Sequence, residues 1–140
     1  MVYVDTSALV PLFIREPSSD AVIDWLESSG ERLAISEWTL VEFASAAAIK
    51  LRVGQATAKL VKQATARMRA FTQKHCTIAV PGREDFRRAT ELASDDALRL
   101  RAGDALHLAI AESLNTRVIL CLDQAMIESA KSLRMTVASL

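Results

Sequence analysis

The chain has 140 residues, of which 51% are hydrophobic and 24% are charged. This size and composition fit one globular domain with a hydrophobic core and leave no room for a second domain. Lysine plus arginine and aspartate plus glutamate both number 17, so the formal net charge is zero. This balance excludes a global positive field that would hold nucleic acid by counterion release alone, so any such contact must be local or mediated by a bound cation.

The sequence contains no feature typical of secretion or of a membrane protein. Its N-terminal residues, MVYVDTSALV, have no basic stretch ahead of an apolar one, and no window approaches 18 uninterrupted apolar residues. Cys76 and Cys121 each lie in a short apolar run, which suits buried reduced thiols better than a disulfide. We therefore expect a cytoplasmic protein.

The predicted elements alternate between strands and helices. A strand over residues 1–4 ends at Asp5, and Thr6 or Ser7 can then cap a helix that runs through Phe13. The next helix follows the breaker segment 16–19 and ends at Gly30. The later predicted elements are a strand over 33–36, helices over 37–51 and 57–71 joined at 53–55, a strand over 77–80, helices over 83–98 and 102–114, a strand over 118–122, a helix over 124–133 and a strand over 136–138.

This alternation predicts an α/β fold. Strands and helices that follow one another at such spacing form a parallel sheet covered by helices on both faces. The helices over 37–51 and 57–71 are expected to form a helical hairpin. No internal repeat, low-complexity segment or flexible linker interrupts the pattern, so we expect a single domain over residues 1–140.

Glu42 differs from the other helical acids. An acid such as Glu84, with Arg87 and Arg88 three and four residues away, is typical of a solvated face. Glu42 has no cation at those spacings and lies in an apolar helix. Because burying an unpaired carboxylate is costly, Glu42 is expected to be protonated, paired with a distant residue or bound to a metal. The alternative is an isolated acid that reaches solvent from the helix edge.

Asp104 lies near the N-terminus of the most apolar predicted helix. The helix dipole favours a carboxylate there, so a simple N-cap competes with a functional role. His107, one turn further along, has two interpretations: a metal ligand, or a hydrogen-bonded core residue, which is the more common case.

Asp5 and Asp123 share one arrangement, an apolar strand that ends in an aspartate just before a helix. Binding sites in open α/β sheets form at the carboxyl ends of the strands. If the two strands are neighbours in the sheet, the two carboxylates meet there. Each aspartate taken alone is better explained as a helix cap.

Two strand-end aspartates and two acids without cationic neighbours can converge on one pocket. Carboxylates packed so closely repel one another, and a hard divalent cation such as Mg²⁺ relieves the repulsion and prefers oxygen ligands. Such an ion can polarise a phosphodiester and activate a bound water. Zinc fits poorly because the pair His75-Cys76 has no second pair at ligand spacing, and the sequence has neither a glycine-rich phosphate loop nor a nucleophile elbow.

Four segments of the chain resemble the acidic motifs of PIN domains, most closely those of the VapC toxins of bacterial and archaeal toxin-antitoxin pairs. They are VDTSAL at 4–9, TLVEF at 39–43, AGDALHLA at 102–109 and LD at 122–123. The similarity covers essentially the whole chain, with the motifs in the expected order and spacing. It implies a three-layer α/β/α fold with a central, mostly parallel sheet.

The same resemblance implies a nuclease site. Asp5, Glu42, Asp104 and Asp123 would surround one or two Mg²⁺ or Mn²⁺ ions and cleave single-stranded RNA with metal-activated water, leaving a 5′-phosphate and a 3′-hydroxyl. Asp5 and Asp104 would be the most direct ligands, whereas Glu42 and Asp123 would act directly or through water. Thr6 would orient a carboxylate, a position that a helix cap would equally explain.

The resemblance also implies partners. VapC toxins typically form homodimers and are silenced by a cognate antitoxin that inserts a segment into the acidic cleft. Arg15 occupies a position where the family often has a basic residue near the cleft, so it is either an RNA or antitoxin contact or a plain surface arginine. Many relatives have threonine or serine two residues before the fourth acid, where this chain has Cys121. Because a thiol is a weaker hydrogen-bond partner than a hydroxyl, Asp123 is expected to be held less firmly.

Two other functions stay open at this point. A PIN-like module could bind RNA or protein without catalysis. The presence of all four acids argues against this alternative, whereas the Cys121 substitution leaves it open. The same nuclease chemistry could also serve RNA processing outside a toxin pair, and the residues do not separate these roles.

Overall fold

A computed structural model describes residues 1–140 and contains the strands and helices expected from the sequence. Their bounds in chain order are β1 (Val2–Val4), α1 (Thr6–Leu9), the short 3₁₀ helix η1 (Val10–Leu12), α2 (Ser19–Ser29), β2 (Leu33–Ser36), α3 (Glu37–Arg52), α4 (Ala58–His75), β3 (Cys76–Ala79), α5 (Arg83–Ser94), α6 (Ala102–Ser113), β4 (Val118–Leu120), α7 (Gln124–Ser132) and β5 (Thr136–Val137).

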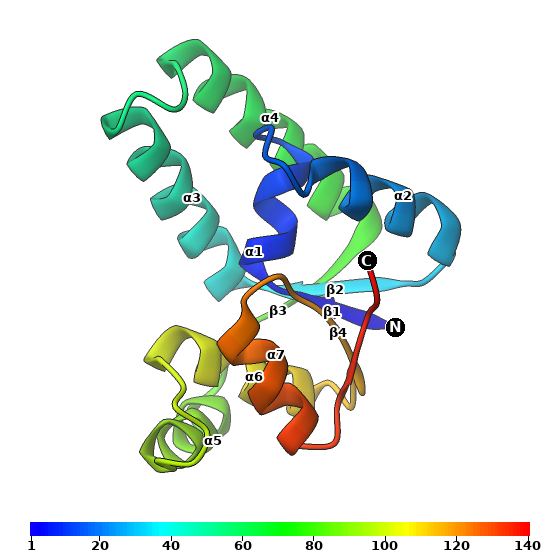
Figure 1. The fold of residues 1–140 in the computed structure, drawn as a ribbon, viewed down its shortest axis with the longest axis vertical. Coiled ribbons are helices and arrows are strands. Elements are labelled where there is room, and N and C mark those ends of the chain that lie inside the picture. The colour runs from blue at the N-terminus through cyan, green and yellow to red at the C-terminus, as the bar shows by residue number, and fades with distance from the viewer.

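The five strands pair into one parallel sheet in the order β3-β2-β1-β4-β5. Helices α1 to α4 cover one face of this sheet and α5 to α7 cover the other (Figure 1). The fold is therefore the predicted three-layer α/β/α arrangement. Helices α3 and α4 form the expected hairpin, which extends beyond the sheet (Figure 1).

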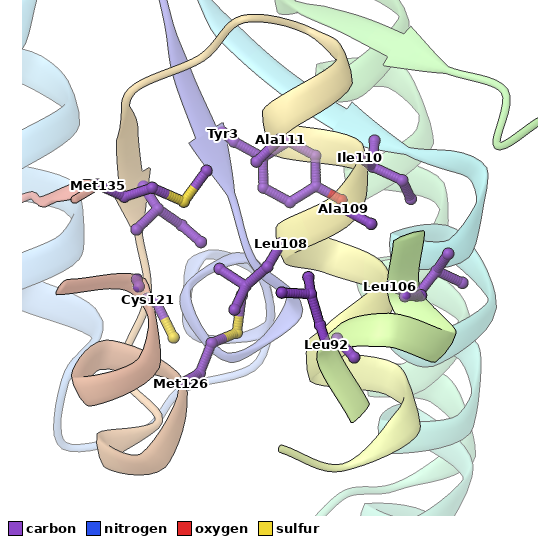
Figure 2. Close-up of a cluster of buried hydrophobic side chains, with 14 of the residues drawn as sticks. Tyr3, Leu92, Leu106, Leu108, Ala109, Ile110, Ala111, Cys121, Met126 and Met135 are labelled. Atoms are coloured by element: carbon purple, nitrogen blue, oxygen red, sulfur yellow. The ribbon is translucent and has the colours of Figure 1, made fainter. Parts of the chain in front are cut away.

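Side chains of β1 alternate between two hydrophobic clusters. Tyr3 belongs to the cluster under α5 to α7, whereas Val2 and Val4 belong to the cluster under α1 to α4. Figure 2 shows the first cluster, in which Tyr3 lies against α6 and Leu108 points toward Met126. These five side chains are at most 1% exposed, and burial of each stabilises the fold by about 1.5–3 kcal/mol.

The first helix begins and ends at positions that differ from the prediction. Asp5, rather than Thr6 or Ser7, is its N-cap, since the Asp5 carboxylate accepts a hydrogen bond from the Ser7 backbone N–H at 3.0 Å. The helix becomes 3₁₀ at Val10, where Pro11 lacks the N–H needed to continue α-helical bonding. Asp5 is therefore placed by its local backbone at the junction of β1 and α1.

Two predicted elements end earlier than expected because side chains capture backbone N–H groups. Helix α5 stops at Ser94, beyond which the Ala97 N–H donates to the Asp95 carboxylate at 3.0 Å. Strand β4 stops at Leu120, and the Leu122 N–H donates to the Ser7 hydroxyl at 2.9 Å. The second of these bonds ties the end of β4 to the start of α1.

The turns and cysteines largely follow the sequence. Gly30 ends α2 with a φ of +60°, a left-handed conformation that glycine adopts without strain. Both cysteines are free thiols, as expected, but only Cys121 is buried, and Cys76 is partly exposed on β3, an edge strand of the sheet. None of the helices combines the length and apolarity that a membrane span requires.

Candidate active site

The sheet brings three of the four predicted acids toward one edge. Strands β1 and β4 are neighbours, as the shared pattern of their aspartates suggested, and the Asp5 N–H donates to the Leu120 carbonyl at 3.0 Å. Asp123 follows β4 and begins α7. Strand β2, on the other side of β1, runs directly into α3, which carries Glu42. The carboxyl ends of three adjacent strands thus position Asp5, Glu42 and Asp123.

The Asp5 carboxylate is 4% exposed and is held through one of its two oxygens. Oδ2 accepts hydrogen bonds from the backbone N–H and the hydroxyl of Ser7, and from the Cys121 thiol at 3.5 Å. Oδ1 has a single neighbour, the Nε2 atom of His107 at 3.3 Å. Ser7 and Cys121 therefore fix the orientation of Asp5 and leave Oδ1 directed away from them.

Glu42 is held in the same one-sided way. The Thr6 hydroxyl donates to Glu42 Oε2 at 2.6 Å, and His107 Nε2 lies 2.7 Å from the same oxygen. Partial burial would raise the pKa of Glu42, but the hydrogen bonds from His107 and Thr6 outweigh burial and leave this pKa below its ordinary value. Glu42 is thus ionised, and its partner within the protein is a histidine on another helix rather than a nearby lysine.

Gly103 allows α6 to approach α3 at Glu42. A Cβ atom at this position would lie 2.7 Å from Glu42 Oε1 and 3.6 Å from the Trp38 indole nitrogen. The Trp38 N–H is buried and makes no hydrogen bond of acceptable geometry, although it lies near enough to Glu42 to help lower the pKa of that carboxyl. Only glycine leaves room for the Glu42 carboxylate here.

The pKa of Asp104, in the first turn of α6, is affected by the charges of the other acids. Its pKa is raised above the ordinary value, first by partial burial and then by the negative charges of Asp123 and Asp5. No side chain donates a hydrogen bond to it. Asp104 is therefore near enough to both aspartates for their charges to repel it, and a backbone hydrogen bond from Arg101 and the attraction of His107 offset that repulsion only in part.

Asp123 is held by its own helix. Its Oδ1 accepts from the Met126 backbone N–H at 2.9 Å and caps α7. The Cys121 thiol contacts the Asp123 backbone carbonyl at 3.7 Å and the Asp5 carboxylate, and not the Asp123 side chain. The thiol is therefore no hydrogen-bond partner of the Asp123 carboxylate, which accepts from the Met126 N–H instead, and the expectation that Asp123 is held less firmly stays a prediction.

His107 connects the acids to a buried polar chain. Its Nδ1 lies 2.8 Å from the Tyr3 hydroxyl, which donates to the Ser36 hydroxyl at 3.0 Å. All three residues are 0% exposed, and burial raises the pKa of Tyr3, so its phenol stays protonated. The sequence left two interpretations of His107; the structure makes it a hydrogen-bonded core residue, although Nε2 also lies within 4.8 Å of oxygens of Asp5 and Glu42.

A pocket of about 660 Å³ lies beside Asp123, which is the one member of the four acids among its lining residues. Thr6, Ser7 and Asp123 line it together with Glu16 and Lys50, which form an ion pair. The sequence analysis did not identify Lys50, since nothing local distinguishes it from other helical lysines. Arg15 is not among the lining residues; its side chain is 70% exposed and makes two hydrogen bonds to Asp20, at 2.6 and 2.7 Å.

These residues fit a hard divalent cation. None of the four acids forms an ion pair with lysine or arginine. Glu42 Oε1 accepts no hydrogen bond, Asp5 Oδ1 has only its contact with His107, and Asp104 has no side-chain donor. Carboxylate oxygens are the ligands that Mg²⁺ and Mn²⁺ prefer, and atoms of Asp5, Glu42 and His107 lie within 4.8 Å of one another.

The fold and the site together define an α/β protein with an acidic cluster at the carboxyl edge of a parallel sheet. The family model of the PIN domain matches residues 2–131. The chain therefore belongs to the PIN domain family.

Solved structures with the same fold include two VapC proteins. The chain is similar to VapC20 of Mycobacterium tuberculosis, a toxin that cleaves the sarcin-ricin loop, with a TM-score of 0.74 and 17% identity over 92% of this chain and 95% of that one. It is also similar to VapBC2 from Rickettsia felis, solved with a DNA fragment from its promoter, with a TM-score of 0.69 and 17% identity over 99% and 98% of the two chains. Comparison with curated proteins finds no significant match.

Proposed function

We propose that this chain is a Mg²⁺- or Mn²⁺-dependent endoribonuclease that cleaves single-stranded RNA, and that it is the toxin of a VapBC-type toxin-antitoxin pair. The observation that carries the proposal is the charge coupling of Asp104 to Asp5 and Asp123 beside the ionised Glu42. Membership of the PIN domain family and the likeness to VapC structures support it.

The four acids have distinct tasks in this proposal. A bound divalent ion would polarise the scissile phosphodiester and lower the pKa of an attacking water. Asp5 and Asp104 hold the ion most directly, because each has carboxylate oxygen without a strong donor on the protein. Glu42 and Asp123 act directly or through water, each from a fixed orientation. Cleavage then leaves a 5′-phosphate and a 3′-hydroxyl.

The pocket beside Asp123 is the proposed place for the RNA. Since the chain has no net charge, affinity for RNA depends on local cations and on the ion itself. Lys50, on the pocket wall, is one such cation and is partly shielded by Glu16. Arg15 is a second candidate contact, for RNA or for antitoxin, and would have to leave Asp20 to serve.

The proposed partners are a cognate antitoxin and a second copy of the chain. The antitoxin would insert a segment into the acidic cleft and compete with RNA. An apolar hollow of about 380 Å³ lined by Trp38, Phe86 and Leu106, with Phe86 itself 54% exposed, gives a homodimer a surface on which to form. Light scattering of wild type and Phe86→Glu tests this, and equal masses for the two would contradict a dimer formed through that surface.

Incubation of the purified protein with total cellular RNA, with and without Mg²⁺, tests the enzymatic proposal. We expect new 5′ ends that require the ion. Asp5→Asn and Asp104→Asn should each lower cleavage by at least about 100-fold, or ~2.7 kcal/mol of transition-state stabilisation. Asp24→Asn, an exposed acid on α2, is the matched control and should cut normally. Identical RNA profiles in all conditions, or full cleavage by both site variants, would refute the mechanism.

The toxin assignment needs its own experiment, because RNA processing would use the same chemistry. Induced expression should arrest growth, and co-expression of a small DNA-binding protein encoded next to this gene should restore it. Normal growth with active nuclease in the cell, or the absence of such a neighbour, would instead favour a processing enzyme.

A further inference from the structure

We propose that His107 and Tyr3 are positioning residues: His107, anchored through Tyr3, holds one oxygen of the Glu42 carboxylate and so sets the orientation in which Glu42 meets the divalent ion, and His107 itself does not bind metal. The inference rests on the proposed metal-dependent function and adds a role that the four acids do not include.

The hydrogen-bond chain determines what His107 can do. The Tyr3 hydroxyl contacts the Ser36 hydroxyl at 3.0 Å and His107 Nδ1 at 2.8 Å. On the other side of the ring, Nε2 faces the ionised carboxylate of Glu42 at 2.7 Å, and an ionised carboxylate can only accept. Nε2 therefore directs its hydrogen toward Glu42, and Nδ1 faces the Tyr3 hydroxyl in the core, so neither nitrogen is turned toward a metal.

These contacts fix how the Glu42 carboxylate is oriented. Glu42 Oε2 accepts from His107 and Thr6, while Oε1 lies against Gly103. Asp5 is oriented by Ser7 and Cys121 through Oδ2, and His107 Nε2 lies 3.3 Å from its Oδ1. His107 thus sets the orientation of the Glu42 carboxylate before any ion binds.

Tyr3 matters because it anchors the ring to the fold. It lies on β1 two residues before Asp5, and Ser36 caps α3, the helix that carries Glu42. Ser36 is itself fixed by Thr39, whose N–H donates to the Ser36 hydroxyl at 3.2 Å. One buried chain therefore links β1, α3 and α6, and a shift of any one of them would move the acids relative to the others.

The geometry admits a rival role, since His107 Nε2 lies within 4.8 Å of oxygens of Asp5 and Glu42 and could in principle complete a three-residue metal site. The two roles predict opposite signals. Pulsed EPR of Mn²⁺ bound to the wild-type protein detects a directly coordinated nitrogen through its hyperfine coupling. We expect no such coupling; its presence would overturn the proposal.

Mn²⁺ affinity, measured by calorimetry, tests the positioning itself. Tyr3→Phe removes only the hydroxyl, and we expect it to weaken Mn²⁺ binding by about 10-fold. His107→Leu should weaken binding by about 10- to 100-fold, and His107→Gln, which keeps an N–H donor, should recover part of the loss. Ser129→Ala is the control, because Ser129 is as buried as Tyr3 but donates to the Leu98 carbonyl away from the acids.

The outcomes separate this inference from the proposed function. Wild type that binds no Mn²⁺ and cuts no RNA would refute the function and the inference together. Wild type that binds and cuts, with unchanged affinity in Tyr3→Phe and His107→Gln, would refute the inference alone. Circular dichroism of each variant shows whether it is folded, and Tyr3→Phe and His107→Gln carry the test if His107→Leu is not.

Discussion

The two halves of the acid cluster are held in different ways. Asp5 and Glu42 receive hydrogen bonds from Ser7, Thr6 and His107, and the pKa of Glu42 is lowered. Asp104 receives none from a side chain, and its pKa is raised by burial and by Asp123 and Asp5. The protein therefore stabilises the charged form of Glu42, whereas burial and the neighbouring aspartates disfavour the charged form of Asp104, which added positive charge would favour. Such a difference is what a preorganised cation site requires.

Gly103→Ala should disturb the packing around Glu42 and lower the stability of the fold more than the other substitutions do. Alanine normally stabilises a helix interior by ~1 kcal/mol relative to glycine, but here its Cβ would lie 2.7 Å from Glu42 Oε1. We expect the free energy of unfolding to fall by about 1–3 kcal/mol, measured by urea denaturation. In a Glu42→Ala background the same change should be neutral or stabilising. An equal loss in both backgrounds would contradict the contact.

Substitutions of Asp123 test whether this residue only stabilises the fold or also takes part in RNA cleavage. Asp123→Ala removes the cap of α7 and should cost ~1 kcal/mol of stability, whereas Asp123→Asn keeps an acceptor and should cost little. Both variants should lower RNA cleavage, because both remove the charge. If Asp123→Asn cut as well as wild type, Asp123 would be a helix cap and nothing more.

The smallest expected effect is on how the free energy of unfolding varies with pH in the absence of divalent ions. It is also the most specific effect, because it reports on Glu42 and Asp104 separately. Because the folded pKa of Glu42 is lowered from 4.5, its contribution to stability is present above that value and is lost as the pH falls through the folded pKa. The folded pKa of Asp104 is raised from 3.8, so its contribution is present below 3.8 and is lost as the pH rises through the folded pKa.

Two variants separate these opposite effects of pH on the free energy of unfolding. Glu42→Gln should remove the loss of stability at low pH, and Asp104→Asn should remove the loss of stability that accompanies rising pH. Thermal denaturation at closely spaced pH values measures both. If Asp104→Asn left the profile unchanged, the repulsion among the three aspartates would be absent.

The features that the sequence predicted well are those that depend on local patterns. Alternating strands and helices predicted the layers, and the repeated strand-aspartate pattern predicted that Asp5 and Asp123 would meet, because parallel neighbours end at one edge. The lack of a cation near Glu42 along its helix predicted an unusual environment for that acid. Each inference used residues within a few positions of one another.

The features that sequence could not predict depend on residues far apart in the chain. Tyr3 and His107 are separated by 104 positions and Glu42 and His107 by 65. No periodicity brings such pairs together; they meet because α6 packs across β1 and α3. The same reason explains why the sequence did not indicate the contact of the Cys121 thiol, which lies against Asp5, 116 positions away, rather than against the carboxylate of its neighbour Asp123.

The central claim is that the acids form one pocket whose repulsion a hard cation relieves. Thermal unfolding of the wild type and of Asp104→Asn, each without and with Mn²⁺, tests it most directly. We expect Mn²⁺ to raise the melting temperature of wild type in a concentration-dependent manner. Asp104→Asn should melt higher than wild type without the ion and respond weakly to it. A wild-type protein whose melting temperature Mn²⁺ does not change would contradict the account.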